Sequence, residues 1–410
     1  MVAKRILVLC GWKIYPTQTG GHLRTACIAQ ALARLGHEVT IYSLAGRQGD
    51  YGWQPSPLVH AIEPRLSEVT HRGYGIGLLQ AIGRRLGWPR VWQYYLLDRG
   101  WIPQSLRRAI ADADIVISDL PYCPPVKTPS KGPGSDPRWY LISHNLEHRL
   151  LAQGSPHEAK WAAWMQAREA EAPSRYDAIL ACAQEDLAFF KDQPRRAGTE
   201  IVLVPNGIDP RLYRRDEDER KRLRAQWGLS DEDYLIVFSG SRFQPNLEAL
   251  VYLQAFSKQH ADFLAAERIH FLVLGSMRDQ ASREGALIFT GRVAATPPYF
   301  AAADAALNPI VRGSGSNVKL FEYLAAHLPI LSTGFGVRGT SLRPDRDYLA
   351  CERGELKAQL LRLKQEKTKA AWQEFAAAVW ERHQASCDME EIMRRAFALL
   401  PHGQSRQAPE

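Results

Sequence analysis

Residues 311–339 read VRGSGSNVKLFEYLAAHLPILSTGFGVRG, and this stretch carries the strongest fold signal in the chain. Glycine and serine alternate over 313–316, directly before a segment, 318–327, whose apolar residues recur at helical spacing. Residues 329–333 then read as a short buried strand that ends in a glycine-rich turn. A glycine-rich loop therefore leads into the N-terminus of a helix, where unpaired N–H groups and the helix dipole favour an anion such as phosphate.

Two charged residues on the predicted helix suit such a ligand. Lys319 places a positive charge in the first turn, where the helix dipole disfavours it, and this indicates a local anion. Glu322 follows three residues later and is placed to accept hydrogen bonds from hydroxyl groups near the same loop. An ordinary loop, helix and strand, whose glycines only make turns, is the alternative.

The longer string resembles the donor-binding segment of the retaining GT-B glycosyltransferases of the family-4 type. In that family a glycine-containing loop precedes K-x-x-E-x-x-A, then a proline, an apolar pair, a threonine and a last pair of glycines. The resemblance implies that the segment holds the sugar diphosphate and ribose of a nucleotide-sugar, with Lys319 as a catalytic residue. The binding residues that it implies here are Gly313, Ser314, Gly315, Ser316, Asn317 and Glu322. Many members carry Glu where this chain has Ser314, which leaves open how the sugar hydroxyls are held.

The composition is that of a globular chain of two to three domains. The 410 residues are 45% hydrophobic and 23% charged, both ordinary values. The formal charge of +8 favours anionic partners such as nucleotides, nucleic acid or acidic membrane surfaces. The six cysteines form no C-x-x-C pair and no zinc spacing, as expected in a reducing cytosol. No apolar run approaches the roughly 18 residues of a membrane helix, and the first one is too short for a signal peptide. We therefore expect a cytoplasmic protein, either free or lying on a membrane face.

The first half opens as a βαβ unit. A buried strand at 6–10 is followed by P-x-x-x-G-G, a helical stretch at 22–35 and a second strand at 39–42. Gly20 and Gly21 either allow a tight turn or let the backbone approach a ligand closely. This loop also resembles the first loop of the same glycosyltransferases, which implies that both glycines face the donor phosphates.

A histidine follows one of the next predicted strands. Buried strands are predicted at 113–118 and 139–143, and His144 comes directly after the second one. Ligands bind at the carboxyl ends of strands in open α/β sheets, although a lone histidine is more often structural. The string H-N-x-E at 144–147 resembles a family segment, which implies that His144 lies beside the transferred sugar as a catalytic residue.

The domain boundary is predicted within residues 200–209, where a strand ends in P-N-G-x-D. Asn-Gly makes a tight turn, and the string also resembles the crossing between the two domains of the family. We expect an acceptor-side Rossmann-like domain at 1–205 and a nucleotide-sugar-binding domain at 206–369. Helices at about 370–400 are expected to pack back on the first domain, and 401–410 to form a disordered tail.

The second domain repeats the α/β pattern. Buried runs at 235–238, 270–274 and 287–290 imply another parallel sheet. The charged run at 214–224 reads as the solvated face of a helix without functional weight. Residues 65–110 combine many arginines with tryptophans and tyrosines, which is typical of helices in a membrane interface and also of solvated helices with a packed aromatic face.

Two more segments of the second domain resemble the family. The string around Arg242 resembles a segment whose arginine pairs with the donor diphosphate, and this implies a catalytic role for Arg242. Family members add a lysine a few residues on, where this chain has Gln244-Pro245-Asn246, so the cationic clamp would consist of Arg242 and Lys319. Residues 290–293 resemble a loop beside the nucleotide base, which implies binding by Arg292 and Val293.

The resemblance implies two doubly wound α/β domains with parallel sheets, facing each other across a cleft in the GT-B architecture. We expect a retaining glycosyltransferase that moves a sugar from a nucleotide-diphospho-sugar, with UDP or GDP favoured, to a hydroxyl of a glycan or lipid-linked acceptor. Polysaccharide or glycolipid biosynthesis is the expected pathway. We expect no nucleic-acid partner, no required cofactor and no metal site. The alternatives are a GT-B sugar-nucleotide epimerase and a nucleotide-sugar-binding protein that has lost catalysis.

Overall fold

The computed structural model describes residues 2–17, 19–44, 58–70, 85, 102–119, 125–126, 136–153, 159–313 and 317–400. The predictions for Ser314–Ser316, for the tail at 401–410 and for most of the basic aromatic segment at 65–110 lie outside these residues. The chain divides into two compact units, Met1–Pro205 with Met389–Glu410, and Asn206–Asp388. Each unit is an α/β structure of its own.

The sheet of the first unit has eight strands among the described residues, in the order β3-β4-β2-β1-β5-β6-β7-β8. They are β1 (Arg5–Cys10), β2 (Glu38–Ser43), β3 (Leu58–Glu63), β4 (Leu66–Thr70), β5 (Ile115–Asp119), β6 (Arg138–Ile142), β7 (Ala178–Ala181) and β8 (Glu200–Leu203). Neighbouring strands are parallel except for β3, which is antiparallel to β4. The central strands are buried on both faces, which explains their continuous apolar sequences.

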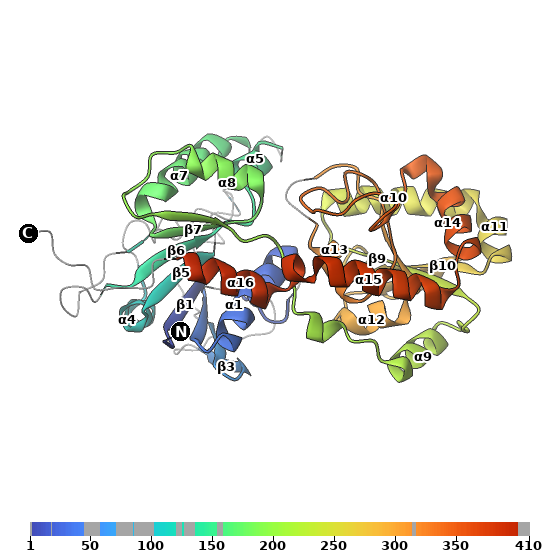
Figure 1. Cartoon of the computed structure of the whole chain (residues 1–410), viewed down its shortest axis with the longest axis horizontal. Coiled ribbons are helices and arrows are strands. Elements are labelled where there is room, and N and C mark those ends of the chain that lie inside the picture. The colour runs from blue at the N-terminus through green and yellow to red at the C-terminus, as the bar shows by residue number, and fades with distance from the viewer. Residues whose placement is uncertain are drawn as a thin grey trace, which may run out of the picture. The chain divides into compact units, whose positions relative to one another are not determined.

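Helices cover both faces of this sheet (Figure 1). They are α1 (Gly20–Arg34), α4 (Gln104–Asp112), α5 (Glu147–Ala152), α7 (Ala162–Arg175), α8 (Gln184–Lys191) and α16 (Met389–Leu399). One core lies between the sheet and α1 with α16, and a second core lies between the opposite face and α4, α7 and α8. Met389, Met393 and Phe397 recur at helical spacing on α16 and are buried in the first core, so the last helix belongs to this unit.

The sheet of the second unit has seven strands in the order β11-β12-β10-β9-β13-β14-β15 within the part of the chain that is described. They are β9 (Tyr234–Ser239), β10 (Ile269–Leu274), β11 (Ser282–Glu284), β12 (Leu287–Gly291), β13 (Ala305–Asn308), β14 (Ile330–Ser332) and β15 (Leu349–Ala350). All neighbours pair in parallel except β11 with β12. The prediction of α/β units with doubly wound, mostly parallel sheets is therefore confirmed.

Two cores lie on the faces of the second sheet. The α-helices of this unit are α9 (Glu217–Gln226), α10 (Gln244–Gln259), α11 (Ala261–Ala266), α12 (Pro297–Ala302), α13 (Val318–Ala325), α14 (Leu356–Gln365) and α15 (Lys369–Cys387), with short 3-10 helices η1 (Pro210–Tyr213) and η2 (Arg353–Glu355). The helix predicted at 318–327 is thus present as α13, two residues shorter. The long helical stretch expected near the C-terminus is divided into α15 and α16 at Asp388.

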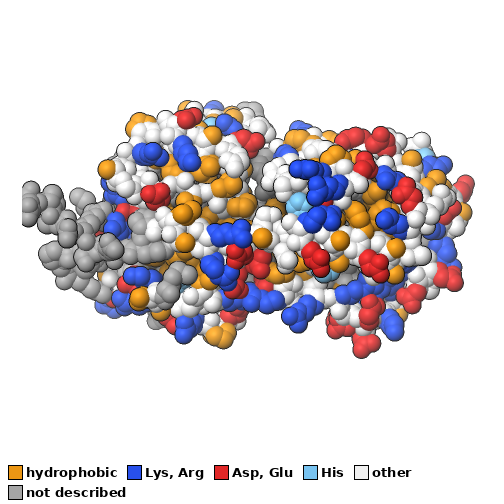
Figure 2. Space-filling view, viewed as in Figure 1, with side chains coloured by type: hydrophobic (Ala, Val, Ile, Leu, Met, Phe, Trp, Pro, Cys, Tyr) orange, Lys and Arg blue, Asp and Glu red, His pale blue; other side chains and the backbone are white. Residues whose placement is uncertain are grey.

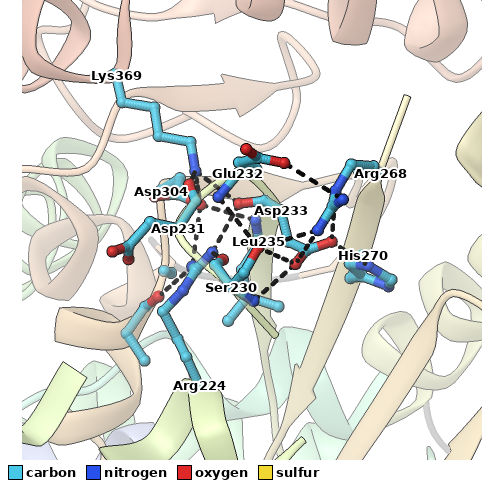
Figure 3. Close-up of polar contacts among 12 residues, drawn as sticks. Arg224, Ser230, Asp231, Glu232, Asp233, Leu235, Arg268, His270, Asp304 and Lys369 are labelled. Carbon is cyan, nitrogen blue, oxygen red and sulfur yellow. Dashed lines mark hydrogen bonds and ion pairs between the residues drawn. The ribbon is translucent and has the colours of Figure 1, made fainter. Parts of the chain in front are cut away.

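The interpretation of the charged run at 214–224 as a solvated face was wrong for two of its arginines. Arg220 and Arg224 on α9 are buried, and both donate to the carboxylate of Asp304, at 2.6 Å and 3.1 Å. Lys369 of α15 lies 3.3 Å from the same carboxylate (Figure 3). Burial alone would raise the pKa of Asp304, but the three cations outweigh it and hold the pKa below its ordinary value. A buried ion cluster therefore ties α9 and α15 to the amino end of β13.

The surface charge is mixed. On the face shown in Figure 2, basic and acidic side chains lie interspersed over both units. The net charge of +8 is thus not gathered into a single basic surface on this face. Among the described residues, no helix is both long enough and apolar enough to cross a bilayer.

Candidate functional site

Most of the predicted site residues follow strands at, or next to, the point where each sheet reverses its order. In the first sheet β2 lies on one side of β1 and β5 on the other, and in the second sheet β10 and β13 flank β9 in the same way. Ligands of open α/β sheets bind beyond the carboxyl ends of the strands at these points, because the connections leave in opposite directions and open a crevice. Each unit therefore has one expected ligand position, and the two are described separately.

In the first unit the centre of this position is Asp119, the last residue of β5. Its Oδ1 lies 2.6 Å from Nε2 of His144 and accepts a hydrogen bond from Oγ1 of Thr25 at 2.7 Å. The Asp119 side chain is fully buried, and that of His144 is 10% exposed. Because a carboxylate oxygen only accepts, Nε2 of His144 carries the proton of this bond. In the neutral imidazole Nδ1 is then left as an acceptor, so Asp119 determines which edge of His144 offers a lone pair.

The structure brings the predicted residues His144, Gly20 and Gly21 together. The glycines form the first turn of α1, and Oγ1 of Thr19 caps the helix by accepting from the N–H of His22 at 3.2 Å. A Cβ on Gly21 would lie 3.9 Å from both Nδ1 and Cε1 of His144. The acceptor edge of the imidazole thus lies beside the N-terminus of a helix.

This region contains unused hydrogen-bonding groups. His22 stacks on Trp12 with the ring centroids 6.0 Å apart, and burial lowers the pKa of His22, although Asp119 acts in the opposite direction. The buried polar atoms near His144 that have no hydrogen-bond partner among the described residues include Trp12 Nε1, His22 Nδ1, Asp119 Oδ2, His144 Nδ1 and Asn145 Oδ1. Buried polar atoms are nearly always paired, so donors and acceptors grouped in this way are suited to a polar ligand or to water.

The segment that carries His144 is held by a buried carboxylate. Glu169 of α7 accepts from the N–H groups of Glu147 and His148 at 2.6 Å and 3.3 Å, and it lies 2.5 Å from Nδ1 of His148. Burial raises the pKa of Glu169 to about 7. Arg24 of α1 donates to the carbonyl oxygen of Ser143, directly after β6, at 3.5 Å and to that of Val204, after β8, at 2.6 Å. The backbone after β6 is therefore fixed by side chains from two helices.

In the second unit Lys319 lies in the first turn of α13 among uncharged contacts. Its Nζ donates to Oδ1 of Asn246 at 2.8 Å and lies 4.8 Å from the centre of the Phe238 ring. Burial lowers the pKa of Lys319 to about 7; Glu322 opposes this shift and Arg338 adds to it. An ammonium group in such surroundings gains strongly from an anion.

Glu322 lies one turn further along α13 and is 8% exposed. Its Oε1 accepts from the hydroxyl of Tyr213 at 3.0 Å and from that of Thr296 at 3.1 Å. Burial raises the pKa of Glu322 to about 7, which the two hydroxyls and Lys319 partly oppose. The carboxylate already binds hydroxyl donors in this structure, which is the chemistry expected toward a ribose.

The N-terminus of α13 is not capped by its own N-cap residue. The Asn317 side chain makes no capping bond and instead donates to the carbonyl oxygen of Gly336 at 2.8 Å. Gly313 has a φ of +144°, a conformation that glycine adopts easily and other residues rarely do. The side chain of Asn317 therefore caps none of the first N–H groups of α13, although among the described residues the N–H of Leu320 donates to the carbonyl oxygen of Asn317 at 3.0 Å. A helix N-terminus without a side-chain cap suits an anion site.

The other predicted residues of this unit are less closely associated with Lys319. Arg242 is exposed and donates to Asp279 at 2.8 Å. Arg292 is exposed after β12, while Val293 packs against the core that contains α13. The predicted clamp of Arg242 and Lys319 is thus not assembled by the described contacts.

Several residues of these sites were not singled out from the sequence. They are Thr25, Asp119, Glu169, Tyr213, Asn246, Thr296 and Arg338. The position of Asp119 at the carboxyl end of a predicted parallel strand was a usable signal. Thr25, Glu169, Tyr213 and Thr296 come from distant elements, and no local pattern indicates them, whereas Asn246 and Arg338 lie within the strings quoted above but were given no role. Among the described residues, no group of three or more His, Cys, Asp or Glu side chains could hold a metal ion.

Comparison with known families matches both halves of the chain. Residues 20–212 match the model described as Glycosyltransferase Family 4, and residues 233–365 match the model described as Glycosyl transferases group 1. A search of curated proteins found no significant match to this chain.

Solved structures share the fold over nearly the whole chain. HepE from Anabaena, solved with UDP and glucose, is 14% identical, with 97% of this chain and 100% of that one covered and a TM-score of 0.61. A UDP-forming trehalose-phosphate synthase from Burkholderia xenovorans, solved with glucose-6-phosphate, is 13% identical, with 96% and 99% covered and a TM-score of 0.65. WaaG, a glycosyltransferase of lipopolysaccharide biosynthesis, is 18% identical, with 96% and 99% covered and a TM-score of 0.59.

Proposed function

Because the chain belongs to the group 1 glycosyltransferases and has their GT-B fold, we propose that it transfers a sugar from a nucleotide-diphospho-sugar to an acceptor hydroxyl with retention at the anomeric carbon. The observation that supports this most strongly is Lys319, an ammonium group held among neutral partners at a helix N-terminus whose N-cap residue makes no side-chain cap. A diphosphate offers the missing negative charge. UDP is the favoured nucleotide, since two of the similar proteins are described with UDP or as UDP-forming, and GDP is the next candidate.

The second unit would bind the leaving group. As the bond to the sugar breaks, negative charge grows on the diphosphate, and preorganised N–H groups and cations stabilise it without rearrangement. Lys319, Gly313 and the first N–H groups of α13 are the described groups for this role, and Ser314, Gly315 and Ser316 remain predicted contacts. Glu322 would exchange the hydroxyls of Tyr213 and Thr296 for those of the ribose. Arg242, Arg292 and Val293 remain predicted contacts of the diphosphate and the base.

The first unit would bind the reacting sugar. His144 offers Nδ1 as an acceptor because Asp119 holds the proton on Nε2, so a sugar hydroxyl is a suitable donor to it. Gly20 and Gly21 would add the N–H groups of the first turn of α1. Our mechanism needs neither a covalent nucleophile nor a metal ion, because the donor phosphate itself can accept the proton of the acceptor hydroxyl.

For the acceptor we propose a glycan or a lipid-linked sugar in polysaccharide or glycolipid biosynthesis, on the cytoplasmic face of a membrane or in the cytoplasm. WaaG provides a precedent of similar fold in lipopolysaccharide biosynthesis. A sugar-phosphate acceptor is the competing class, since the similar trehalose-phosphate synthase was solved with glucose-6-phosphate. Incubation with radiolabelled donor and either glucose-6-phosphate or a lipid extract separates these classes by whether the label enters the aqueous or the organic phase.

The test is a binding and turnover panel of UDP-, GDP-, ADP- and TDP-sugars with the wild type, Lys319→Ala, Glu322→Ala and the exposed control Lys357→Ala. We expect one nucleotide to raise the melting temperature by several degrees in the wild type and the control, and in neither site variant. Slow release of free sugar from the same donor, with the anomeric configuration followed by NMR, tests retention. Conversion of the donor sugar into its epimer would favour the sugar-nucleotide epimerase. Binding without turnover would favour a nucleotide-sugar-binding protein that has lost catalysis. If no nucleotide-sugar binds, or both site variants bind as well as the wild type, the proposal fails.

A further inference from the structure

The turn after β14 is fixed against the N-terminus of α13. The carbonyl oxygen of Gly336 accepts from Nδ2 of Asn308 at 3.0 Å and from Nδ2 of Asn317 at 2.8 Å. The N–H of Gly336 donates to Oγ1 of Thr333 at 2.9 Å. A Cβ on Gly336 would lie 2.3 Å from Oγ of Ser332, so only glycine allows this packing. The turn is thus held beside Asn317, the N-cap residue of α13.

Arg338, in this turn, places its guanidinium beside Gly313. The guanidinium of Arg338 stacks on the ring of Phe335 at 4.0 Å, and Nη1 donates to the carbonyl oxygen of Phe335 at 3.1 Å. Its Nη2 lies 3.3 Å from the position that a Cβ on Gly313 would occupy. The guanidinium is therefore directly beside the last described residue of the loop before α13.

Arg338 also adds to the positive charge around Lys319. It is close enough to contribute to the lowered pKa of Lys319, after burial and against the effect of Glu322. Two cations at the positive end of one helix repel each other and the dipole. Glu322, the acidic residue that opposes this, is itself bound to Tyr213 and Thr296. Such an arrangement is stabilised by a ligand with more than one negative charge.

We infer that Arg338 is a second cation of the diphosphate site, and that it acts with Lys319 in place of the lysine that this chain lacks around Gln244. The inference rests on the proposed function and specifies its anion subsite. A guanidinium suits the role because its paired N–H groups match two phosphate oxygens. Arg242 is the competing candidate, but it is exposed and paired with Asp279.

The experiment measures, by calorimetry, the affinity of whichever of UDP, GDP, ADP and TDP binds the wild type, and that of the matching nucleoside. The variants are Arg338→Gln, Arg338→Lys and Arg362→Gln. The last removes the same charge from a half-buried arginine paired with Asp345 and Glu366. A melting curve without ligand shows whether each variant is folded.

We expect Arg338→Gln to weaken diphosphate binding about tenfold or more, the size of a lost charged hydrogen bond, while nucleoside binding changes little. Arg338→Lys should recover part of the loss, and Arg362→Gln should bind like the wild type. If Arg338→Gln is folded and binds within about twofold of the wild type while Lys319→Ala does not, the role of Arg338 is refuted and the proposed function stands. If no diphosphate binds the wild type, both are refuted. If Arg338→Gln does not fold, Arg338→Lys is the deciding variant, because it keeps the charge but not the paired N–H groups. Arg338→Lys must then bind the diphosphate more weakly than the wild type does, and equal affinities would overturn the inference.

Discussion

Donor binding should depend on pH in a bell-shaped manner because of two groups on α13. The pKa of Lys319 is lowered to about 7, and that of Glu322 is raised to about 7. A bound diphosphate favours the charged ammonium and returns the pKa of Lys319 toward its ordinary value of about 10.4. Ribose hydroxyls that donate to Glu322 favour the carboxylate and lower its pKa toward about 4.3. Binding is therefore strongest where both groups are charged in the free protein, close to neutral pH.

The alkaline and acid limbs of the plot of affinity against pH should differ in size between about pH 6 and pH 9. Since the pKa of Lys319 is raised on binding, its contribution is complete below about pH 7 and is lost as the pH rises. From pH 7 to pH 9 this contribution falls about 50-fold, or about 2.3 kcal/mol, since each pH unit corresponds to about 1.36 kcal/mol. Glu322 becomes fully charged over the same range and gains about twofold, so the net affinity should fall about 25-fold. Since the pKa of Glu322 is lowered on binding, its contribution is complete above about pH 7 and is lost as the pH falls. From pH 7 to pH 6 this contribution falls about fivefold, and because Lys319 gains about twofold over the same range, the net affinity should fall about threefold.

Isothermal titration calorimetry in buffers of different ionisation enthalpy measures both the affinity and the protons exchanged. The ligand should be a nucleotide-sugar, because a terminal phosphate titrates near pH 6 and would obscure the acid limb. Lys319→Met should remove the alkaline limb, Glu322→Gln should remove the acid limb, and the exposed control Lys357→Met should keep both. An affinity that stays constant from about pH 6 to pH 9 in the wild type would refute this account. So would limbs that persist unchanged in the two site variants.

Three further substitutions test the scaffold. Asp304→Asn should lower the free energy of unfolding, measured by urea denaturation, by about 3–5 kcal/mol, because three cations lose their shared carboxylate. The control Asp345→Asn, at an exposed ion pair, should lower it by at most about 1 kcal/mol. Equal losses in the two variants would contradict the role of the buried cluster. Gly275→Ala should destabilise the protein by about 1–3 kcal/mol, because the φ of Gly275 is +109° and a Cβ there would lie 2.5 Å from a backbone oxygen. In the control Gly354→Ala, the added Cβ meets nothing within 4 Å. An unchanged melting temperature for Gly275→Ala would contradict this prediction. Asp119→Asn should lower kcat at least about tenfold, because the histidine loses its fixed tautomer beside the reacting sugar. The affinity for the nucleoside diphosphate alone, which the second unit would bind, should not change, and a fall in that affinity with kcat unchanged would argue against the role.

The placement of Lys319 and Glu322 on one helix could be predicted from the sequence, because it depends on a local repeat. The same holds for the buried strands before His144 and for the alternation of strands and helices that predicts two α/β units. Local propensity and periodicity determine such features, since the residues involved are separated by only a few positions. The resemblance to a glycosyltransferase family used the same local strings.

The long-range partners could not be predicted in this way. Asp119 meets His144 because β5 lies next to β6, and Arg220 reaches Asp304 across 84 positions because the packing of α9 places it at the amino end of β13. A charged run looks the same in sequence whether it faces solvent or a buried carboxylate, which is why the expected solvated face was wrong.

The sequence by itself thus determined many of the strands and helices, among them the helix α13 that follows the glycine-rich segment. Only the tertiary structure decided which charges share a site, as with Arg338 beside Gly313 and Arg242 paired with Asp279. The physical reason is that burial and strand order set the distances between charges, and these distances, rather than residue type, fix the pKa values and the partners.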